Sequence, residues 1–217
     1  MPPNTAKTRV VCYIDGFNLY HSIDNLDRPH LKWVDLWCLC ETMLREGESL
    51  VAVKYFSAFA KWLPNPYRRH RSYVAALESV GVTPIMSHFK EKWRSCKKCG
   101  NEWKAHEEKE TDVRIALAIM EDGIDGLYDR AIIVSGDSDL VPVIEKARTR
   151  FVHKSFYVAA PPGQYSKSRN IRGVSHGSFE ISPARLQKCL FDEVVVNQDG
   201  ETVSDRPEQY ALPVAND

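Results

Sequence analysis

The chain has 217 residues, of which 43% are hydrophobic and 27% are charged. These values are typical of one globular domain, and they exclude a fibrous repeat and a wholly disordered chain. Lysine plus arginine equals aspartate plus glutamate at 29 each. No overall basic field therefore indicates a nucleic-acid partner, and any such binding must depend on local clusters.

The sequence also bears on membranes and compartment. No apolar run approaches the ~20 residues needed to cross a bilayer, and residues 1–5 lack the apolar core of a signal peptide. We therefore expect a cytoplasmic protein with no membrane partner. The composition leaves a homo-oligomer open.

The first half of the chain predicts alternating strands and helices. Residues 10–14 are apolar and β-branched, as in a parallel strand covered on both faces, and they end at Asp15. Asp35 gives an acidic start to a helix at about 34–44. The remaining predicted elements are a strand at 50–59, a helix at 64–80 closed by Gly81, and a strand at 82–89.

The second half begins with a charged segment at 90–108 that has neither helix nor strand periodicity. Residues 111–120 predict a buried helix with Asp112 in its first turn, and residues 131–134 are the plainest parallel strand of the chain. The other predicted elements are a helix at 140–148, a strand at 155–160 and a short closing helix at 186–191.

Strands that alternate with helices predict an α/β fold that is Rossmann-like and doubly wound, with a mostly parallel sheet flanked by helices and a small cysteine-containing insert. We expect one domain over residues 8–175, with the insert at 90–108. A C-terminal extension at 176–202 should pack on this domain, and residues 203–217 should form a flexible tail. Sheets of this type bind ligands beyond the carboxyl ends of their strands.

Four aspartates occur where such a ligand would bind: they are Asp15, Asp112, Asp137 and Asp139. Clustered carboxylates repel one another, so the cluster is costly unless a hard cation such as Mg²⁺ or Mn²⁺ lies between them. Asn18 and Ser135 are placed to support the carboxylates by hydrogen bonding. The alternative is that each aspartate caps the helix that follows it, although two acids in the turn at 135–139 exceed what one cap needs.

Three motifs together resemble the signature of the NYN domain family, a PIN-like nuclease group once classed with LabA-like proteins. They are residues 13–18 (YIDGFN), 109–113 (KETDV) and 134–139 (VSGDSD), and the resemblance spans roughly residues 8–175. Many relatives have glycine where this chain has Glu110. The resemblance implies a PIN-like fold and a metal-dependent ribonuclease whose metal site is formed by Asp15, Asp112, Asp137 and Asp139, with Asn18 and Ser135 beside it.

The insert contains a second candidate metal site. Cys96 and Cys99 form a Cys-x-x-Cys pair that supplies two ligands of a tetrahedral zinc site, and His88 and His106 would complete a Cys₂His₂ set. The alternative is a reduced, exposed pair between two ordinary surface histidines. The six cysteines do not resemble a secreted disulfide framework, so we expect thiols or a bound metal rather than disulfides.

Three local clusters combine cations, which suit phosphates, with aromatic rings, which suit unpaired bases, and they predict binding of single-stranded RNA. Charge runs are usually solvated surface, so each cluster alone is weak evidence. Lys109 would neutralise the scissile phosphate or simply lie in solvent among glutamates. The other residues predicted to bind nucleic acid are Trp93, Lys97 and Lys98 in the insert, then Arg68, Arg69 and Arg71, and finally Lys167, Arg169 and Arg172.

Two other functions fit the same pattern. One is a catalytically silent RNA-binding regulatory module on this fold, against which the intact set of four aspartates argues. The other is a phosphatase of the haloacid-dehalogenase type, whose nucleophile motif needs a second aspartate two residues after the first. Phe17 occupies that position here and cannot act as a general acid.

Overall fold

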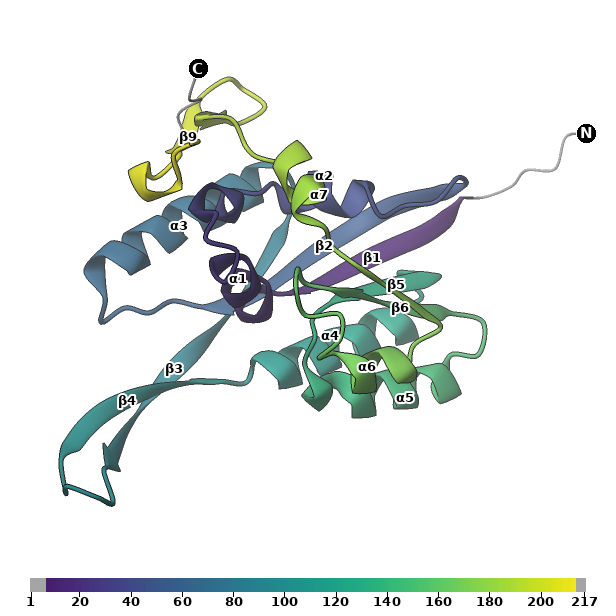
Figure 1. Ribbon diagram of the computed structural model, residues 1–217. Coiled ribbons are helices and arrows are strands. Elements are labelled where there is room, and N and C mark those ends of the chain that lie inside the picture. Colours follow the sequence, from purple (N-terminus) through teal and green to yellow (C-terminus); the bar gives the residue numbers. More distant parts are fainter. Residues whose placement is uncertain (1–6, 214–217) are drawn as a thin grey trace, which may run out of the picture.

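The computed structural model describes residues 7–213. Its centre is a seven-stranded sheet in the order β4-β3-β2-β1-β5-β6-β7 (Figure 1). All neighbouring strands are parallel except β3 and β4. The predicted α/β fold with a mostly parallel, doubly wound sheet is therefore confirmed. The strands are β1 (Thr8–Asp15), β2 (Glu48–Ala58), β3 (Thr83–Ser95), β4 (Glu102–Lys109), β5 (Arg130–Val134), β6 (Ser155–Ala160) and β7 (Gly177–Glu180).

Helices cover both faces of this sheet. The three helices α4 (Thr111–Ile124), α5 (Val141–Arg150) and α6 (Arg169–Gly173) lie together on one face (Figure 1). The other face is covered by α1 (Gly16–Asp24), α2 (Leu36–Glu41), α3 (Pro64–Ser79) and α7 (Pro183–Lys188). Short 3-10 turns occupy Pro29–Lys32, Ser138–Leu140 and Glu208–Tyr210. Within residues 7–213, no helix has the length and apolar character needed to span a bilayer.

The two central strands have the apolar sequence that this position requires. All five residues of β5 are buried, and β1 is buried from Val10 onward. Their register pairs Val10 with Arg130 and Ile14 with Val134. Because both strands end at the same level, the residues that follow Ile14 and Val134 emerge side by side at one edge of the sheet. This edge is called the carboxyl edge below.

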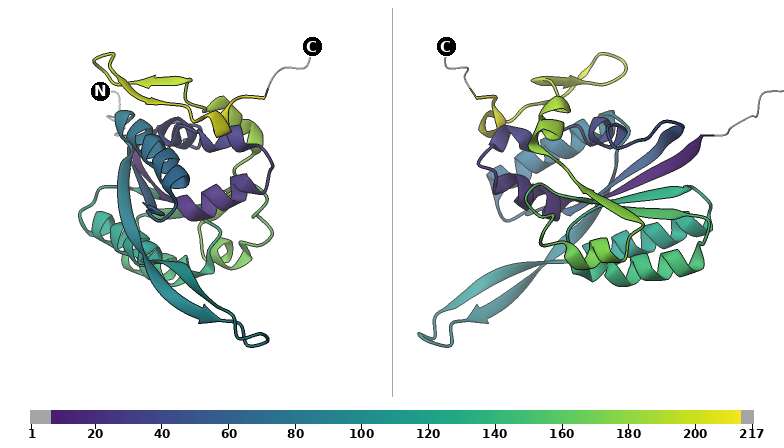
Figure 2. Two further views of the ribbon diagram at one scale, coloured as in Figure 1. Left: turned by 90° about the vertical axis from the view of Figure 1, so that its left-hand side faces the viewer. Right: turned by 45° about the vertical axis from the view of Figure 1, so that its right-hand side comes forward.

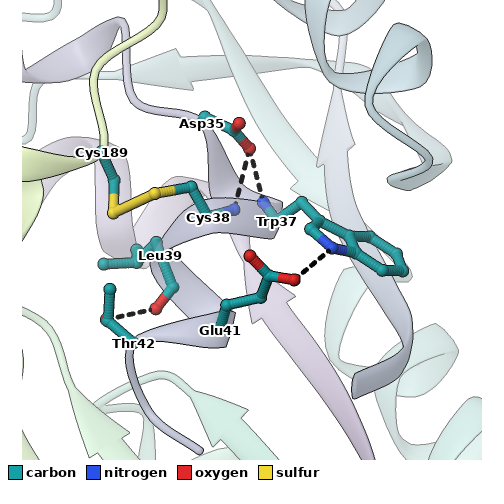
Figure 3. Close-up of a disulfide and its surroundings, with 7 residues drawn as sticks. All are labelled: Asp35, Trp37, Cys38, Leu39, Glu41, Thr42 and Cys189. Atoms are coloured by element: carbon teal, nitrogen blue, oxygen red, sulfur yellow. Dashed lines mark hydrogen bonds between the residues drawn. A yellow bond between two sulfur atoms is a disulfide. The ribbon is translucent and has the colours of Figure 1, made fainter. Parts of the chain in front are cut away.

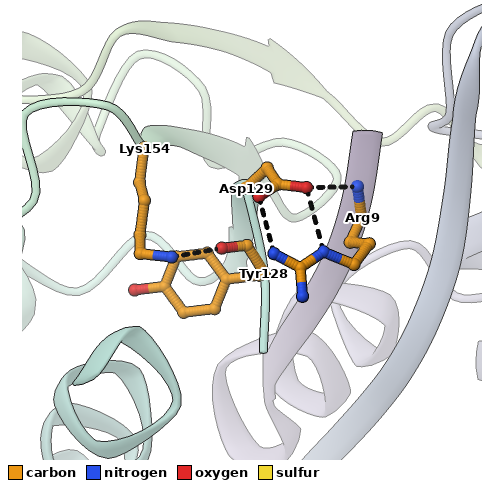
Figure 4. Close-up of polar contacts among 4 residues, drawn as sticks. All are labelled: Arg9, Tyr128, Asp129 and Lys154. Atoms are coloured by element: carbon orange, nitrogen blue, oxygen red, sulfur yellow. Dashed lines mark hydrogen bonds and ion pairs between the residues drawn. The ribbon is translucent and has the colours of Figure 1, made fainter. Parts of the chain in front are cut away.

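The opposite edge of the sheet is fixed by an ion pair near the start of β1. The guanidinium of Arg9 donates to Asp129 at 2.8 and 3.1 Å, and the Arg9 backbone N–H donates to the same carboxylate at 2.9 Å (Figure 4). Lys154 donates to the backbone carbonyl of Tyr128 at 2.6 Å. These contacts join the start of β1 to the residues that precede β5 and β6, so they set the level at which the three strands begin.

The charged segment at 90–108 is regular rather than irregular, so the predicted absence of strand structure there is wrong. Strand β3 continues to Ser95 and pairs with β4 as an antiparallel hairpin, with His88 opposite Lys109 and Ser95 opposite Glu102. The hairpin extends away from the rest of the molecule (Figures 1 and 2). Its distal part has solvent on both faces, so its sequence lacks the alternation of apolar and polar residues that identifies a half-buried strand.

The C-terminal residues also differ from expectation. The closing helix spans Pro183–Lys188 instead of 186–191, and Gly177–Glu180 adds a strand to the main sheet. The predicted flexible tail is wrong for residues 203–213, because Thr202–Asp205 pairs with Val194–Val196 as strands β9 and β8. Tyr210 is buried in the same core as α1 and α3. Residues 214–217 lie outside the described residues.

A disulfide joins Cys38 of α2 to Cys189 just after α7, with 5.5 Å between the two Cα atoms (Figure 3). The expectation of thiols or a bound metal is therefore wrong for this pair. Backbone hydrogen bonds reinforce the join, from Asp35 N–H to Cys189 O at 2.7 Å and from Phe191 N–H to Trp33 O at 3.0 Å. The remaining cysteines, at positions 12, 40, 96 and 99, are free thiols.

Candidate functional site

The four aspartates come from three separate segments that meet at the carboxyl edge. Asp15 is the last residue of β1, Asp137 and Asp139 follow β5, and Asp112 lies in the first turn of α4. Asp15, Asp112 and Asp137 line one hollow of about 260 Å³. This hollow is called the acidic hollow below. Asp139 is exposed beside it.

Hydrogen bonds fix the two strand ends that carry the aspartates. Ser135 Oγ donates to Asp15 Oδ2 at 2.9 Å and accepts from Asp137 N–H at 3.1 Å. Asn18 Oδ1 accepts from Gly136 N–H at 2.9 Å, while Asn18 N–H donates to Asp15 Oδ1 at 3.0 Å. The hydrogen bonds of Asn18 and Ser135 therefore hold the turn after β5 in contact with the start of α1.

Helix capping accounts for part of the aspartate pattern. Asp15 caps α1 through Asn18 N–H, and Asp137 caps the 3-10 turn through Asp139 N–H at 2.9 Å. Asp112 and Asp139 cap no helix, because the position before α4 is Glu110 and Asp139 lies inside the turn. Capping and clustering are compatible, since a carboxylate oxygen that accepts one hydrogen bond keeps a second lone pair.

The carboxylates in the acidic hollow are held close enough to influence one another. The pKa of Asp15 is raised to about 6. Burial contributes most, the charges of Asp112 and Asp137 contribute less, and the two hydrogen bonds that Asp15 accepts act in the opposite direction. Burial also raises the pKa of Asp112 to about 6, with the charges of Asp137, Glu108 and Asp139 adding to it. Across residues 7–213 no lysine or arginine forms an ion pair with any of the four aspartates.

The donor set fits a hard divalent cation better than a soft one, because it consists of carboxylate, amide and hydroxyl oxygens. In the described part of the chain, however, no three His, Cys, Asp or Glu side chains converge tightly enough to hold an ion by themselves. Mg²⁺ usually retains several waters and binds through one or two carboxylates. A group of acids spread around a water-filled hollow is compatible with that mode of binding.

Sequence reasoning missed several residues that line the acidic hollow. Glu108 does so from the end of β4, and it accepts a hydrogen bond from Thr111 N–H at 3.2 Å. Gln164 reaches the hollow from the loop after β6, the strand beside β5. The position of Gln164 after a strand was a usable signal, since loops at the carboxyl edge form the ligand site in this fold. Phe17, His21 and Thr111 complete the lining.

A larger cavity of about 560 Å³ adjoins the acidic hollow. It lies among α1, the end of β2, the start of α3 and the base of the β3–β4 hairpin. Phe17, His21 and Glu108 line both spaces. This space is called the aromatic cavity below, because six of its lining side chains are Phe or Tyr: Phe17, Tyr20, Tyr55, Tyr73, Phe89 and Tyr210.

The predicted Cys₂His₂ set is not assembled. Cys96 and Cys99 lie at the tip of the hairpin, whereas His88 pairs with Lys109 at its base, seven positions before Ser95. At about 3.3 Å per residue that separation is roughly 23 Å. His106 stacks on Trp62, with ring centroids 3.7 Å apart. The backbone N–H groups of Lys98 and Cys99 point at the Cys96 sulfur and lower the pKa of its thiol.

The predicted RNA-binding residues lie on three segments around the carboxyl edge. Arg68, Arg69 and Arg71 are in the first two turns of α3, which follows β2. Lys167, Arg169 and Arg172 lie in the connection after β6 and in α6. Two of these cations stack on rings, Arg172 on Tyr165 at 3.6 Å and Arg71 on Tyr67 at 5.9 Å. The hairpin carries Lys97 and Lys98 at its tip and Lys109 at its base.

The two tryptophans of the hairpin face opposite sides. Trp93 lies opposite Lys104 and Trp103 lies opposite Arg94, so the alternation of a strand directs them to different faces. Trp93 shares its face with Phe89 and His106, which line the aromatic cavity. Lys109 lies on the other face, where it pairs with Glu107 at 3.0 Å. The hairpin therefore has one face that leads from Trp93 to the cavity.

Helices on both faces of a parallel sheet, with acids gathered at its carboxyl edge, define a PIN-like α/β domain. The model of the NYN domain family matches residues 9–174, and the chain belongs to this family. Domains of the family are generally nucleases that act on RNA.

Two further comparisons find similar proteins. The chain is 25% identical over 244 aligned residues to 6-hydroxy-3-succinoylpyridine 3-monooxygenase HspA of Pseudomonas putida (strain DSM 28022 / S16), covering 94% of this chain and 75% of that protein. It also resembles the crystal structure of VPA0982, a protein of unknown function from Vibrio parahaemolyticus RIMD 2210633. That match has a TM-score of 0.57 at 21% identity and covers 88% of this chain and 100% of the other. It concerns the fold alone.

Proposed function

We propose that this protein is a divalent-metal-dependent nuclease that hydrolyses phosphodiester bonds of single-stranded RNA. The observation that carries the proposal is the gathering of Asp15, Asp112 and Asp137 from three segments around one hollow, with Asp139 beside it. Four unpaired acids would be costly to keep together for structure alone. Membership of the NYN family supports the same activity.

Individual residues of the chain would have distinct roles in this reaction. Asp15 and Asp137, fixed by Ser135, would hold Mg²⁺ or Mn²⁺, with Asp112 and Asp139 binding its waters. A bound divalent cation would activate a water for attack on phosphorus and stabilise charge on the leaving oxygen. Asn18 would maintain the geometry through Gly136 N–H. No side chain needs to form a covalent intermediate.

The approach of the RNA is supported by the position of the basic clusters. The first turns of α3 and the connection to α6 follow the carboxyl ends of β2 and β6. Arg68 and Arg71 in α3, and Lys167 and Arg169 around the start of α6, therefore lie on segments at the same edge as the aspartates. Phosphate contacts of this kind position a strand without reading its sequence. A chain with no net charge could therefore bind RNA locally at this edge.

The test is incubation of the purified protein with end-labelled single-stranded RNA and DNA in Mn²⁺, Mg²⁺ or EDTA. We expect cleavage of RNA with either metal and none with EDTA. Cleavage that persists in EDTA would contradict metal dependence. Binding without cleavage in both metals would favour the silent RNA-binding module, and release of inorganic phosphate from a phosphomonoester would favour a phosphatase.

A second candidate function follows from the aromatic cavity. One relative is named as a monooxygenase of a substituted pyridine, and a cavity of about 560 Å³ lined by aromatic rings is of a size and character that suits a small heterocycle. Hydroxylation would consume dioxygen and a two-electron reductant, so both must be present in the assay. Conversion of 6-hydroxy-3-succinoylpyridine in the presence of NADH and air would support this candidate. Recovery of the unchanged compound would remove it.

We also propose that Cys96 and Cys99 supply two ligands to a zinc ion, with the other ligands coming from water or a second molecule. The exposed thiol of Cys99 and the backbone N–H groups that lower the pKa of Cys96 support this. We expect the purified protein to contain zinc that is absent from the Cys96→Ser/Cys99→Ser variant. Equal zinc content in the two proteins would contradict the proposal.

A further inference from the structure

The aromatic cavity is a site to which the catalytic proposal gives no role. Its volume of about 560 Å³ lies within the roughly 300–1,000 Å³ of pockets that bind small organic groups. It is not sealed by the chain, since Tyr20 and Leu63 on its wall are exposed to solvent at 39% and 44% of their surface. A group could therefore enter from the surface.

The walls present flat aromatic surfaces from several directions. Tyr55 meets Tyr73 edge-on with ring centroids 6.1 Å apart, and Phe17 meets Phe89 edge-on at 5.6 Å. Trp62 stacks on His106 at the hairpin side, with an angle of only 6° between the two rings. Aromatic faces of this kind favour a planar ring, which can stack on them or meet their edges.

A few polar groups are positioned to orient such a ring. Tyr55 Oη and His70 Nε2 lie 3.2 Å apart. Burial lowers the pKa of His70 to about 4, so its imidazole is neutral near pH 7 and offers both a donor and an acceptor. The buried hydroxyl of Ser57 also lies on the wall, and Arg69 Nε is buried with no hydrogen-bond partner among residues 7–213. A purely apolar ligand would leave these groups unused.

The position of the cavity connects it to the acidic hollow. Phe17, His21 and Glu108 line both spaces, so an aromatic group in the cavity lies next to a phosphate at the aspartates. A nucleotide places its base and its phosphate on opposite sides of one sugar. The face of the hairpin that carries Trp93 continues to Phe89 and His106 at the cavity, and it provides a further ring for a neighbouring base.

We propose that the aromatic cavity binds one unpaired nucleobase of the RNA strand and thereby places the adjacent phosphodiester at the aspartates. This inference rests on the proposed nuclease function, since it takes RNA as the ligand. A free small heterocycle has the same kind of planar ring as a nucleobase, so the experiment must distinguish it from a base of RNA.

The experiment measures binding without cleavage. Fluorescein-labelled RNA 12-mers, each with one abasic nucleotide at a different position, are titrated in EDTA against the wild-type protein. Because stacking of one base on aromatic side chains is worth ~1–3 kcal/mol, we expect one position at which loss of the base weakens binding about tenfold. Equal affinity for all the oligonucleotides would overturn the proposal.

Two variants locate the effect. Ala60→Trp adds an indole to the cavity wall and should exclude the base. Every oligonucleotide should then bind this variant as weakly as the most weakly bound abasic oligonucleotide binds wild type, so the difference between positions should disappear. Val152→Trp makes the same change at a site exposed over 73% of its surface and absent from the lining, so it should bind like wild type. A positional penalty that survives in Ala60→Trp would place the base elsewhere. If Ala60→Trp does not fold, Tyr20→Ala opens the wall at an exposed position and should weaken binding about tenfold.

Free uridine, free adenosine and 6-hydroxy-3-succinoylpyridine are then added as competitors. A compound that binds wild type but not Ala60→Trp, while no abasic position matters, would assign the cavity to small heterocycles and overturn the RNA proposal. Since all binding is measured in EDTA, failure of the cleavage assay leaves a positional base penalty standing. Conversely, metal-dependent cleavage without any positional penalty would overturn the cavity proposal and leave the nuclease standing.

Discussion

The hydroxyl of Ser135 donates a hydrogen bond of 2.9 Å to Oδ2 of Asp15. This contact joins the carboxyl ends of β5 and β1, two strands that are 120 residues apart in the sequence. It orients the Asp15 carboxylate while leaving it close to Asp112 and Asp137. The hydrogen bond therefore fixes the orientation of the Asp15 carboxylate, whose oxygen atoms cannot rotate freely away from the other acids of the acidic hollow.

The first prediction concerns catalysis. Asp15→Asn and Asp137→Asn should each abolish metal-dependent cleavage of RNA, because each removes a charge from the proposed cation site. The metal-free variants should melt no lower than wild type, because a repulsive charge is lost while the amide oxygen can still accept the capping hydrogen bond. The measurements are cleavage of labelled RNA in Mn²⁺ and thermal melting in EDTA. Wild-type cleavage rates in both variants would make the carboxylates structural and remove the nuclease proposal.

The second prediction concerns pH. The pKa values of Asp15 and Asp112 are raised to about 6 in the fold from the ordinary aspartate value of 3.8. The folded protein therefore binds more protons than the unfolded chain between these values, and the free energy of unfolding should fall as pH rises through this window. Asp15→Asn should be more stable than wild type above about pH 7, and the difference should vanish by about pH 4. Urea unfolding in the absence of metal measures this, and a difference independent of pH would contradict it.

The third prediction concerns Glu110, whose φ of 75° lies in the left-handed region. Glycine adopts this conformation without the ~1–2 kcal/mol that other residues lose there. Glu110→Gly should therefore be more stable than Glu110→Ala by about 1 kcal/mol, the reverse of the usual order inside a helix. Chemical unfolding of the two variants provides the comparison. Equal stability would mean that the backbone relaxes around alanine.

The fourth prediction concerns the bond between Cys38 and Cys189. Because the bond closes a long loop of the unfolded chain, the Cys38→Ser/Cys189→Ser variant should lose about 2–5 kcal/mol of unfolding free energy. Dithiothreitol should lower the midpoint of wild type to that of the variant. Cys96→Ser/Cys99→Ser in zinc-free buffer serves as the control, since neither residue takes part in a disulfide. Insensitivity of wild type to the reductant would argue that the bond does not stabilise the fold.

The centre of the fold was predictable because its signals are local. The four apolar residues at 131–134 predict a strand with both faces covered, and all of them are buried in β5. The aspartates at the ends of β1 and β5 were placed at one edge by the rule that parallel strands meet there. Asp112 was assigned to the same edge because it begins the helix that follows the charged segment at 90–108.

The hairpin and the site lining were harder to predict. Charged residues occur on both faces of β3 and β4, so the sequence does not show which face is turned toward the site. Nothing in the sequence distinguishes Glu107 from Glu108, of which only Glu108 lines the acidic hollow. The assignment depends on register, which sets Glu108 opposite Phe89 and on the face toward the cavity. A shift of one residue would exchange the two glutamates.

Long-range pairings left no signal in one sequence. Cys38 lies in an apolar helical pattern and Cys189 in a C-terminal segment 151 residues later, so spacing could not pair them. The structure of residues 203–213 likewise depends on contacts with distant segments. Ser204 donates to Ser72 O at 3.0 Å, and Tyr210 packs on the core formed by α1 and α3. Residues 203–213 alone are too polar to predict structure.

The bond between Cys38 and Cys189 closes residues 38–189 into a covalent ring, and the hairpin tip is part of this ring. A protease that cuts once within this ring, for example after Lys97 or Lys98, leaves a single molecule whose two pieces stay joined. Its mass would change only by one water, and electrophoresis would separate the pieces only after reduction. Nicking at the tip would thus leave the rest of the protein assembled, and a digest resolved with and without reductant would map the ring.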